Sequence, residues 1–105
     1  MARWAMSELR RNNPATVAEA AHALGRFTSR DWIGEVDVPA SVVVTTQDRL
    51  VPPHRQRKLA QSIPGAQVFE VHGDHGACVM EAHRFVPTLV RATQSVAERA
   101  RATAR

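Results

Sequence analysis

Two short apolar runs stand out along the chain, and each is followed by polar and turn-forming residues. The first run covers Ser41–Thr46 and contains three consecutive valines, and the second covers Gln67–His72. A run that is apolar at successive positions is typical of a strand buried on both faces of a parallel sheet. The stretch from Pro53 to Ser62 has a helical apolar face and stops at Pro64-Gly65. The pattern therefore predicts a strand, a helix and a second, parallel strand.

Helical spacing of apolar residues marks the flanking segments. Asn13 and Pro14 form an N-cap and first helical position, and Gly25 is expected to end that helix in a left-handed cap. Residues 1–11 predict a further short helix with Trp4 and Leu9 turned inward. Residues 27–39 predict a connector, in which Trp32, Ile33 and Val36 need a surface to lie on.

A long helix is predicted over residues 84–101, and Pro87 is tolerable there because it then lies near the first turn. Its apolar stripe is expected to comprise Phe85, Val86, Leu89, Val90, Val96 and Ala97. The fold class is thus α/β. Two strands make a poor sheet, and no other run indicates a strand, so an open edge on the 41–46 strand should leave the isolated chain marginally stable or prone to self-association.

Length and composition narrow the class of protein. A chain of 105 residues with 44% apolar residues is at most one small folded domain. No apolar stretch approaches the roughly 20 residues that span a membrane, and the N-terminus lacks the apolar core of a signal peptide, which predicts a cytoplasmic protein. Cys78 is the single cysteine, which excludes an internal disulfide. We expect it to be a small packing residue.

The net charge of +4 raises the question of nucleic-acid binding. The densest basic group is Arg55, Arg57 and Lys58, and no aromatic residue interleaves with it to stack on bases. This group is therefore interpreted as a solvated helix face, with no nucleic-acid partner.

The polar residues that follow the two runs carry the candidate chemistry. Asp48 comes shortly after the first run, and His75 shortly after the second. The carboxyl ends of neighbouring parallel strands lie at one rim of a sheet, so this carboxylate and imidazole are expected within bonding reach. There Asp48 would hold the tautomer of the His75 ring and stabilise its protonated form. The alternatives are a turn cap for Asp48 and a backbone-bound loop histidine for His75, with Asp74 as a turn former.

In order and spacing these motifs resemble the C-terminal end of the α/β-hydrolase fold family. There a D-x-x-V-P-P segment, here Asp48–Pro53, follows the strand of the triad acid, and a glycine-containing turn after the last strand presents the triad histidine, here His75. A final helix closes the domain. The resemblance implies that residues 1–34 derive from the cap and its connector and that residues 35–105 form the last βαβα part of the core.

The resemblance also implies hydrolysis of a carboxylic ester or similar acyl bond, with His75 as general base, Asp48 as its orienting acid and no cofactor. The nucleophile, an upstream serine or aspartate in a complete enzyme, is missing. None of the serines lies in a G-x-S-x-G turn, and the oxyanion-hole segment is missing as well; the serines are Ser7, Ser29, Ser41, Ser62 and Ser95. We therefore expect no meaningful catalysis by the chain alone.

Two other functions fit parts of the sequence. His72, Asp74 and His75 are zinc-ligand types, and their segment resembles the H-x-H-x-D-H signature of metallo-β-lactamase-like hydrolases, although Glu70 stands at its first position. The second alternative is a non-catalytic interaction module that completes the sheet of a partner chain.

Overall fold

The computed structural model describes residues 2–104, which form two compact units that divide after Asp31. The first unit consists of helices α1, Ala2–Arg10, and α2, Pro14–Arg26. Asn13 caps α2 as predicted, since its Oδ1 accepts a hydrogen bond from the backbone N–H of Ala15 at 2.9 Å. This cap fixes the residue at which α2 begins.

Two predictions for this unit are wrong. Helix α2 runs through Gly25 and ends when Phe27 adopts an extended conformation, with its N–H bonded to the carbonyls of Ala23 and Leu24. No left-handed glycine is needed, because this N–H satisfies the last carbonyls of the helix. Trp4 and Leu9 are 60% and 51% exposed, because α1 contacts only α2 within its unit and buries no side chain.

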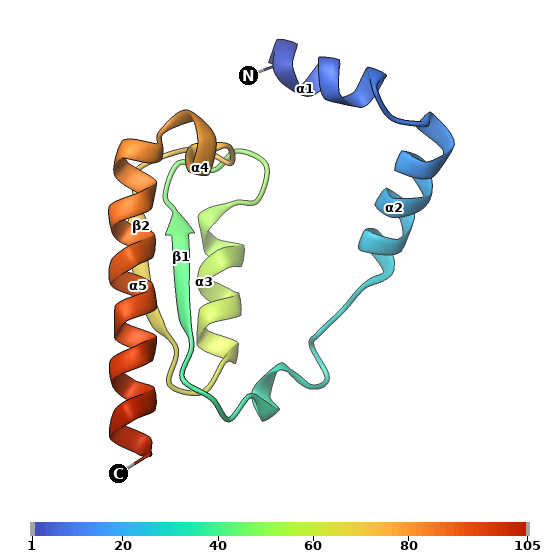
Figure 1. The fold of residues 1–105 in the computed structure, drawn as a ribbon. Helices are drawn as coiled ribbons and strands as arrows, with labels where there is room; N and C mark the ends of the chain where they lie inside the picture. Colours follow the sequence, from blue (N-terminus) through green and yellow to red (C-terminus); the bar gives the residue numbers. More distant parts are fainter. Residues whose placement is uncertain (1, 105) are drawn as a thin grey trace. The chain divides into compact units, whose positions relative to one another are not determined.

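The second unit is a mixed α/β structure in which two strands pack with helices (Figure 1). Its elements are η1 (Ile33–Glu35), β1 (Ser41–Thr45), α3 (Pro53–Ser62), β2 (Gln67–Val71), α4 (Ala77–Met80) and α5 (Ala82–Thr103). The strands are parallel, with register from Ser41 opposite Gln67 to Thr45 opposite Val71. The parallel strand–helix–strand order is therefore confirmed.

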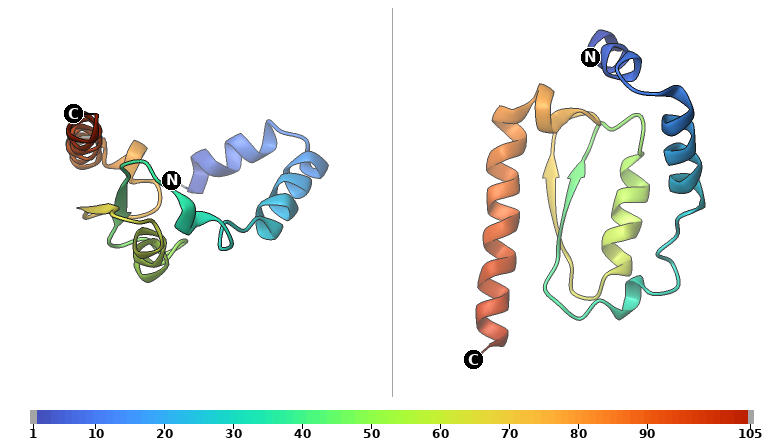
Figure 2. Two further views of the ribbon diagram at one scale, coloured as in Figure 1. Left: turned by 90° about the horizontal axis from the view of Figure 1, so that it is seen from below. Right: turned by 45° about the vertical axis from the view of Figure 1, so that its right-hand side comes forward.

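Helices α3 and α5 lie on opposite sides of the strands (Figure 2). Helix α5 packs on both strands, and α3 packs mainly on β1. The core between them is small: its fully buried large side chains are Val44 and Val71, and its other buried apolar residues are Ala60, Ala77 and Ala92. Small alanines let the helix backbones approach the sheet closely, which limits the apolar area that the unit buries.

Helix α5 differs from its prediction at its start and on its packing face. It begins at Ala82, so that Pro87 lies inside the helix, beyond the first turn. Its buried residues are Thr88 and Ala92, whereas the predicted core residues Val86, Leu89 and Val90 are 45–49% exposed. The single turn α4 and the short helix η1 were not predicted, since segments this short carry no periodic signal.

In residues 2–104, no further strand pairs with the outer edge of β1. Thr45 N–H and C=O point away from β2 and bond to the side-chain amide of Gln56 on α3. Because alternate residues of a parallel strand point the same way, the backbone of Val43 faces this edge too. Within residues 2–104, no backbone or side-chain partner outside the β1–β2 ladder is present for Val43.

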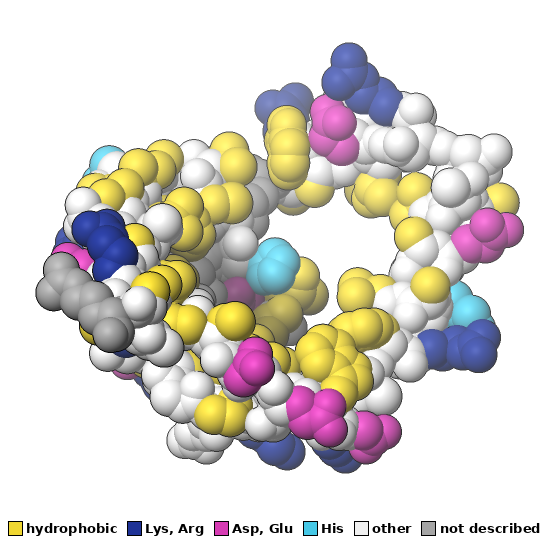
Figure 3. Space-filling model, turned by 60° about the horizontal axis from the view of Figure 1, so that its bottom comes forward, with side chains coloured by type: hydrophobic (Ala, Val, Ile, Leu, Met, Phe, Trp, Pro, Cys, Tyr) yellow, Lys and Arg dark blue, Asp and Glu magenta, His cyan; other side chains and the backbone are white. Residues whose placement is uncertain are grey.

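Many apolar side chains of the second unit are exposed. Figure 3 shows hydrophobic side chains over much of the visible surface. Those of the second unit include Val38, Leu50, Leu59, Val68, Val79, Met80, Val86, Leu89 and Val90. Cys78 is also exposed, so its predicted packing role is wrong. In the part of the chain described, no helix has the length and apolar character needed to cross a membrane.

Candidate functional site

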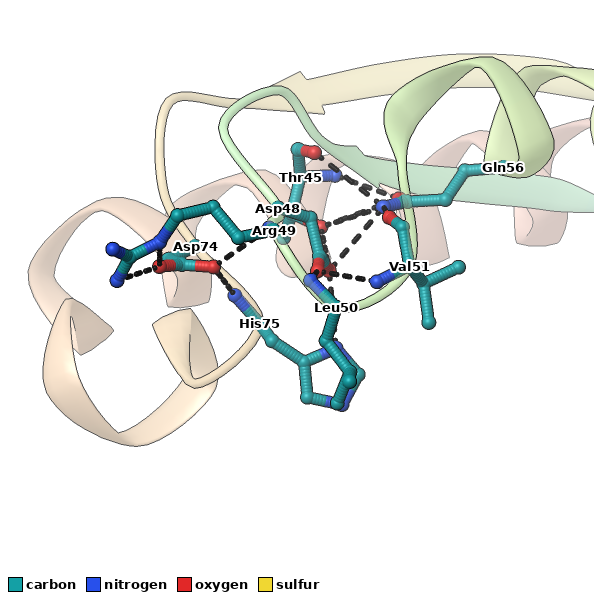
Figure 4. A network of polar contacts seen from close by, with 8 residues as sticks. All are labelled: Thr45, Asp48, Arg49, Leu50, Val51, Gln56, Asp74 and His75. Atoms are coloured by element: carbon teal, nitrogen blue, oxygen red, sulfur yellow. Dashed lines mark hydrogen bonds and ion pairs between the residues drawn. The ribbon is translucent and has the colours of Figure 1, made fainter. Parts of the chain in front are cut away.

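The structure brings together the two residues that the sequence singled out. Asp48 lies in the loop after β1 and His75 in the loop after β2, and His75 Nδ1 is 3.1 Å from Asp48 Oδ2 (Figure 4). Parallel pairing explains the meeting, because it places the carboxyl ends of both strands at the same rim. Beyond the strands, the N–H of Thr46 donates to Val71 O and the N–H of Gln47 donates to Gly73 O. These two hydrogen bonds hold the starts of both loops next to each other.

The carboxylate of Asp48 is buried and held from several directions. Its Oδ1 accepts hydrogen bonds from the backbone N–H groups of Leu50 at 2.9 Å and Val51 at 2.8 Å. This is the turn-capping role that was an alternative for Asp48, and it coexists with the contact to His75. The cap leaves Oδ2 as the oxygen that faces the imidazole.

Two further side chains bind Oδ2 beside His75. The hydroxyl of Thr45 donates at 2.9 Å, and Nε2 of Gln56 donates at 3.3 Å. The carboxylate thus accepts five hydrogen bonds although its side chain is only 4% exposed. A buried carboxylate that is satisfied in this way has one fixed orientation.

These contacts set the charge of the acid. Burial is the largest single influence and raises the pKa of Asp48, but the N–H of Val51, the Thr45 hydroxyl, the His75 ring and the N–H of Leu50 together lower that pKa to about 2. Asp48 is therefore ionised at neutral pH, because hydrogen bonds to the charged form outweigh desolvation. An ionised carboxylate only accepts hydrogen bonds.

The state of the His75 ring follows from that of Asp48. Since Oδ2 cannot donate, Nδ1 must carry a proton, and a neutral ring then has its lone pair on Nε2. The side chain is 49% exposed, and no hydrogen bond to Nε2 is present within residues 2–104. The arrangement can accept a proton at Nε2 and stabilise the resulting imidazolium through Asp48.

Gln56 supports the acid from the first turns of α3. Its Oε1 accepts from Thr45 N at 2.9 Å, and its Nε2 donates to the Thr45 hydroxyl at 2.9 Å and to Val51 O at 2.8 Å. One amide therefore joins the end of β1, the acid and the loop before α3. The sequence marks this residue only by its place, as a long amide in the first turns of the helix that follows the acid loop.

Asp74 and Arg49 form a second link between the loops. Asp74 Oδ1 accepts from the backbone N–H groups of Arg49 at 3.0 Å and His75 at 2.8 Å. Its Oδ2 accepts from Nε and Nη2 of Arg49, each at 2.7 Å. The N–H of Arg49, then that of His75 and then the guanidinium lower the pKa of Asp74. The expected role of Asp74 as a local turn former is incomplete, since it joins two loops.

The structure does not assemble the zinc-ligand set. Within the described residues, no group of three or more His, Cys, Asp or Glu side chains is placed to hold a metal ion. The Asp74 carboxylate binds Arg49, the His75 ring faces Asp48, and His72 lies near the Thr46 hydroxyl at 3.5 Å. The geometry thus lends the zinc hypothesis no support.

The serines of the second unit bond to groups away from the His75 ring. The hydroxyls of Ser41, Ser62 and Ser95 donate to Ala92 O, Lys58 O and Gln67 Oε1. Among the described residues of the second unit, no serine bonds to the His75 ring. Comparison with protein-family models, with curated protein sequences and with solved structures gives no match.

Proposed function

We propose that this chain is the acid- and base-bearing part of a serine-type α/β hydrolase that cleaves carboxylic esters or similar acyl bonds. The observation that carries the proposal is the 3.1 Å contact between His75 Nδ1 and the buried, ionised Asp48, which leaves Nε2 of a half-exposed ring as the proton acceptor. The parallel strands, the helices on both faces and the order of acid before histidine support it.

In the complete site, a nucleophile supplied from outside this chain would complete the reaction. His75 Nε2 takes the proton of its hydroxyl as the oxygen attacks the ester carbonyl, and Asp48 stabilises the imidazolium that forms. The ring then returns that proton to the leaving alcohol, which leaves an acyl-enzyme. Water, deprotonated by the same nitrogen, releases the carboxylic acid and restores the nucleophile. An aspartate nucleophile needs His75 only in the second half of this sequence.

The open edge of β1 is where the rest of such a sheet would pair. The outward backbone of Val43 and the half-exposed valines and leucine of α5 support this placement. Helices α1 and α2 would then be the cap-derived segment, within residues 1–34, and residues 35–105 the core portion. The substrate would be a small molecule, and no cofactor is required.

The same edge supports a second candidate, a non-catalytic module that completes the sheet of a partner chain. In that case the purified chain should bind a partner through β1, and loss of His75 should leave binding unchanged. Binding that needs an intact β1 edge, with no esterase activity in the complex, would favour this candidate over the hydrolase.

The test of the hydrolase begins with the reading frame upstream of Met1. Translated, it should contain a strand followed by a G-x-S-x-G or G-x-D-x-G turn. The polypeptide extended to include that turn should hydrolyse p-nitrophenyl butyrate, whereas the chain alone should not. His75→Ala should lower kcat by on the order of 10⁶ and Asp48→Asn by on the order of 10⁴.

His83→Ala is the matched control, because His83 is an exposed histidine on α5 and its loss should leave kcat unchanged. Equal activity with and without His75 would refute the proposal. A chain that, without any added segment, hydrolyses the ester in a His75-dependent way would refute the requirement for an outside nucleophile.

A further inference from the structure

The loops of the acid and the base have few direct connections. The last backbone bond between them joins Gln47 N to Gly73 O at 3.0 Å, immediately before Asp48 and Asp74. Beyond that point each loop turns away toward its own helix, α3 or α4. The separation of Asp48 and His75 therefore depends on the contacts that join the two loops after this last backbone hydrogen bond.

That next connection is the side chain of Asp74. Its Oδ1 accepts from the N–H of Arg49, which adjoins the acid, and from the N–H of His75, which is the base itself. Its backbone carbonyl accepts from Ala77 N at 3.0 Å, which anchors the residue to the first turn of α4. Figure 4 shows Asp74 and Gln56 on opposite sides of Asp48, so the two supports are independent.

From this geometry we infer that Asp74 is a positioning residue for the acid–base pair, a role that rests on the proposed function of that pair. One carboxylate oxygen holds the backbone on either side of the contact, so its loss lets the His75 ring move away from Asp48 Oδ2. The two bonds to backbone N–H groups carry most of this effect. The Arg49 guanidinium carries little, because its side chain is 87% exposed and surface ion pairs contribute weakly.

The readout is the tautomer of the His75 ring, measured by ¹⁵N NMR on histidine-labelled full chain and assigned with His75→Ala. A residue that only stabilises the fold would not change the tautomer of the His75 ring as long as the protein stays folded. The measurement is made at about pH 9, above the range in which imidazoles ordinarily titrate. The parent chain should show the Nδ1–H form in excess, because the charged acceptor Asp48 selects it.

The variants separate the two kinds of contact. Asp74→Ala should lower the ratio of Nδ1–H to Nε2–H forms by about tenfold, the size expected when a charge-assisted hydrogen bond is lost. Asp74→Asn keeps an oxygen for both backbone N–H groups and should lower the ratio by less than about threefold. Arg49→Met should have a similarly small effect. Glu70→Ala is the matched control and should change nothing, because this carboxylate pairs with the Arg57 side chain at 3.0 Å and not with either loop of the site within residues 2–104.

The outcomes distinguish this inference from the proposed function. Asp48→Asn should abolish the preference for Nδ1–H, and an unchanged ratio there would refute the acid–base pair itself. An Asp48-dependent ratio that is the same in parent and Asp74→Ala would overturn only the role of Asp74. If far-UV circular dichroism shows that Asp74→Ala does not fold, Asp74→Ser, whose shorter side chain does not bridge both N–H groups, replaces it and should give the same fall. An unchanged ratio in Asp74→Ser would also overturn the inference.

Discussion

Acid should weaken this fold in part through the buried carboxylate of Asp48. Its pKa is about 2 in the folded chain and 3.8 in an unfolded reference. This difference corresponds to a stabilisation of about 1–2 kcal/mol, after allowance for the adjoining His75 ring, which is half open to solvent. Because the folded pKa is the lower one, this stability is fully present above the unfolded pKa and is lost as the pH falls through the folded pKa.

The assay is urea unfolding, followed by far-UV circular dichroism, of the parent and Asp48→Asn at a series of pH values from about 6 to about 2. The difference in the free energy of unfolding should be largest at the upper end and should shrink by about 1–2 kcal/mol at the lower end. Asp74 also has a lowered pKa, but it is present in both proteins and so cancels in the difference. A difference that stays constant across this pH range would refute the assignment of the acid sensitivity to Asp48.

Three other substitutions test the packing. Val44→Ala should lower the free energy of unfolding by about 1.5–3 kcal/mol, because Val44 is 0% exposed; urea unfolding measures this, and a loss below about 0.5 kcal/mol would contradict a core at this position. Gly73→Ala should cost at most about 1 kcal/mol, because the Glu81 carboxylate that the new Cβ would overlap ends a flexible side chain and can move aside; urea unfolding measures this, and a loss above about 2 kcal/mol would show that Glu81 is held in place. Pro87→Ala should raise the free energy of unfolding by about 1–3 kcal/mol, because it restores a backbone donor to the His83 carbonyl. The thermal midpoint should rise accordingly, and an unchanged midpoint would show that α5 begins later in solution.

Local pattern was sufficient to predict the main elements of the second unit. The bounds of α3 agree with the structure, and those of β1 and β2 differ from the prediction by one residue at their ends. The Asn13 cap was also predicted. Each of these features depends on residues adjacent in sequence, such as a run of valines or a proline at a helix start. The parallel pairing of the two strands could then be predicted, because a single helix that connects two neighbouring strands allows few other arrangements.

Packing faces were less predictable. The α5 stripe was assigned by hydrophobicity, yet Thr88 and Ala92 face the sheet while Val86 is 49% exposed. Small residues lie where a helix approaches a strand most closely. That point depends on the side chains of the helix and of the strands together, so the helix sequence alone does not reveal it. Trp4 was expected inward for the same reason and is 60% exposed.

The amino-acid sequence by itself determined that an acid and a histidine follow two parallel strands, since strand order and spacing place both at one rim. Only the tertiary structure decided how they are held. The ionised state of Asp48 depends on Thr45, His75 and two backbone N–H groups that converge on it, and the bridge through Asp74 joins residues of different loops. Such contacts depend on distances of a few tenths of an ångström between segments distant in sequence, and no local pattern encodes those distances.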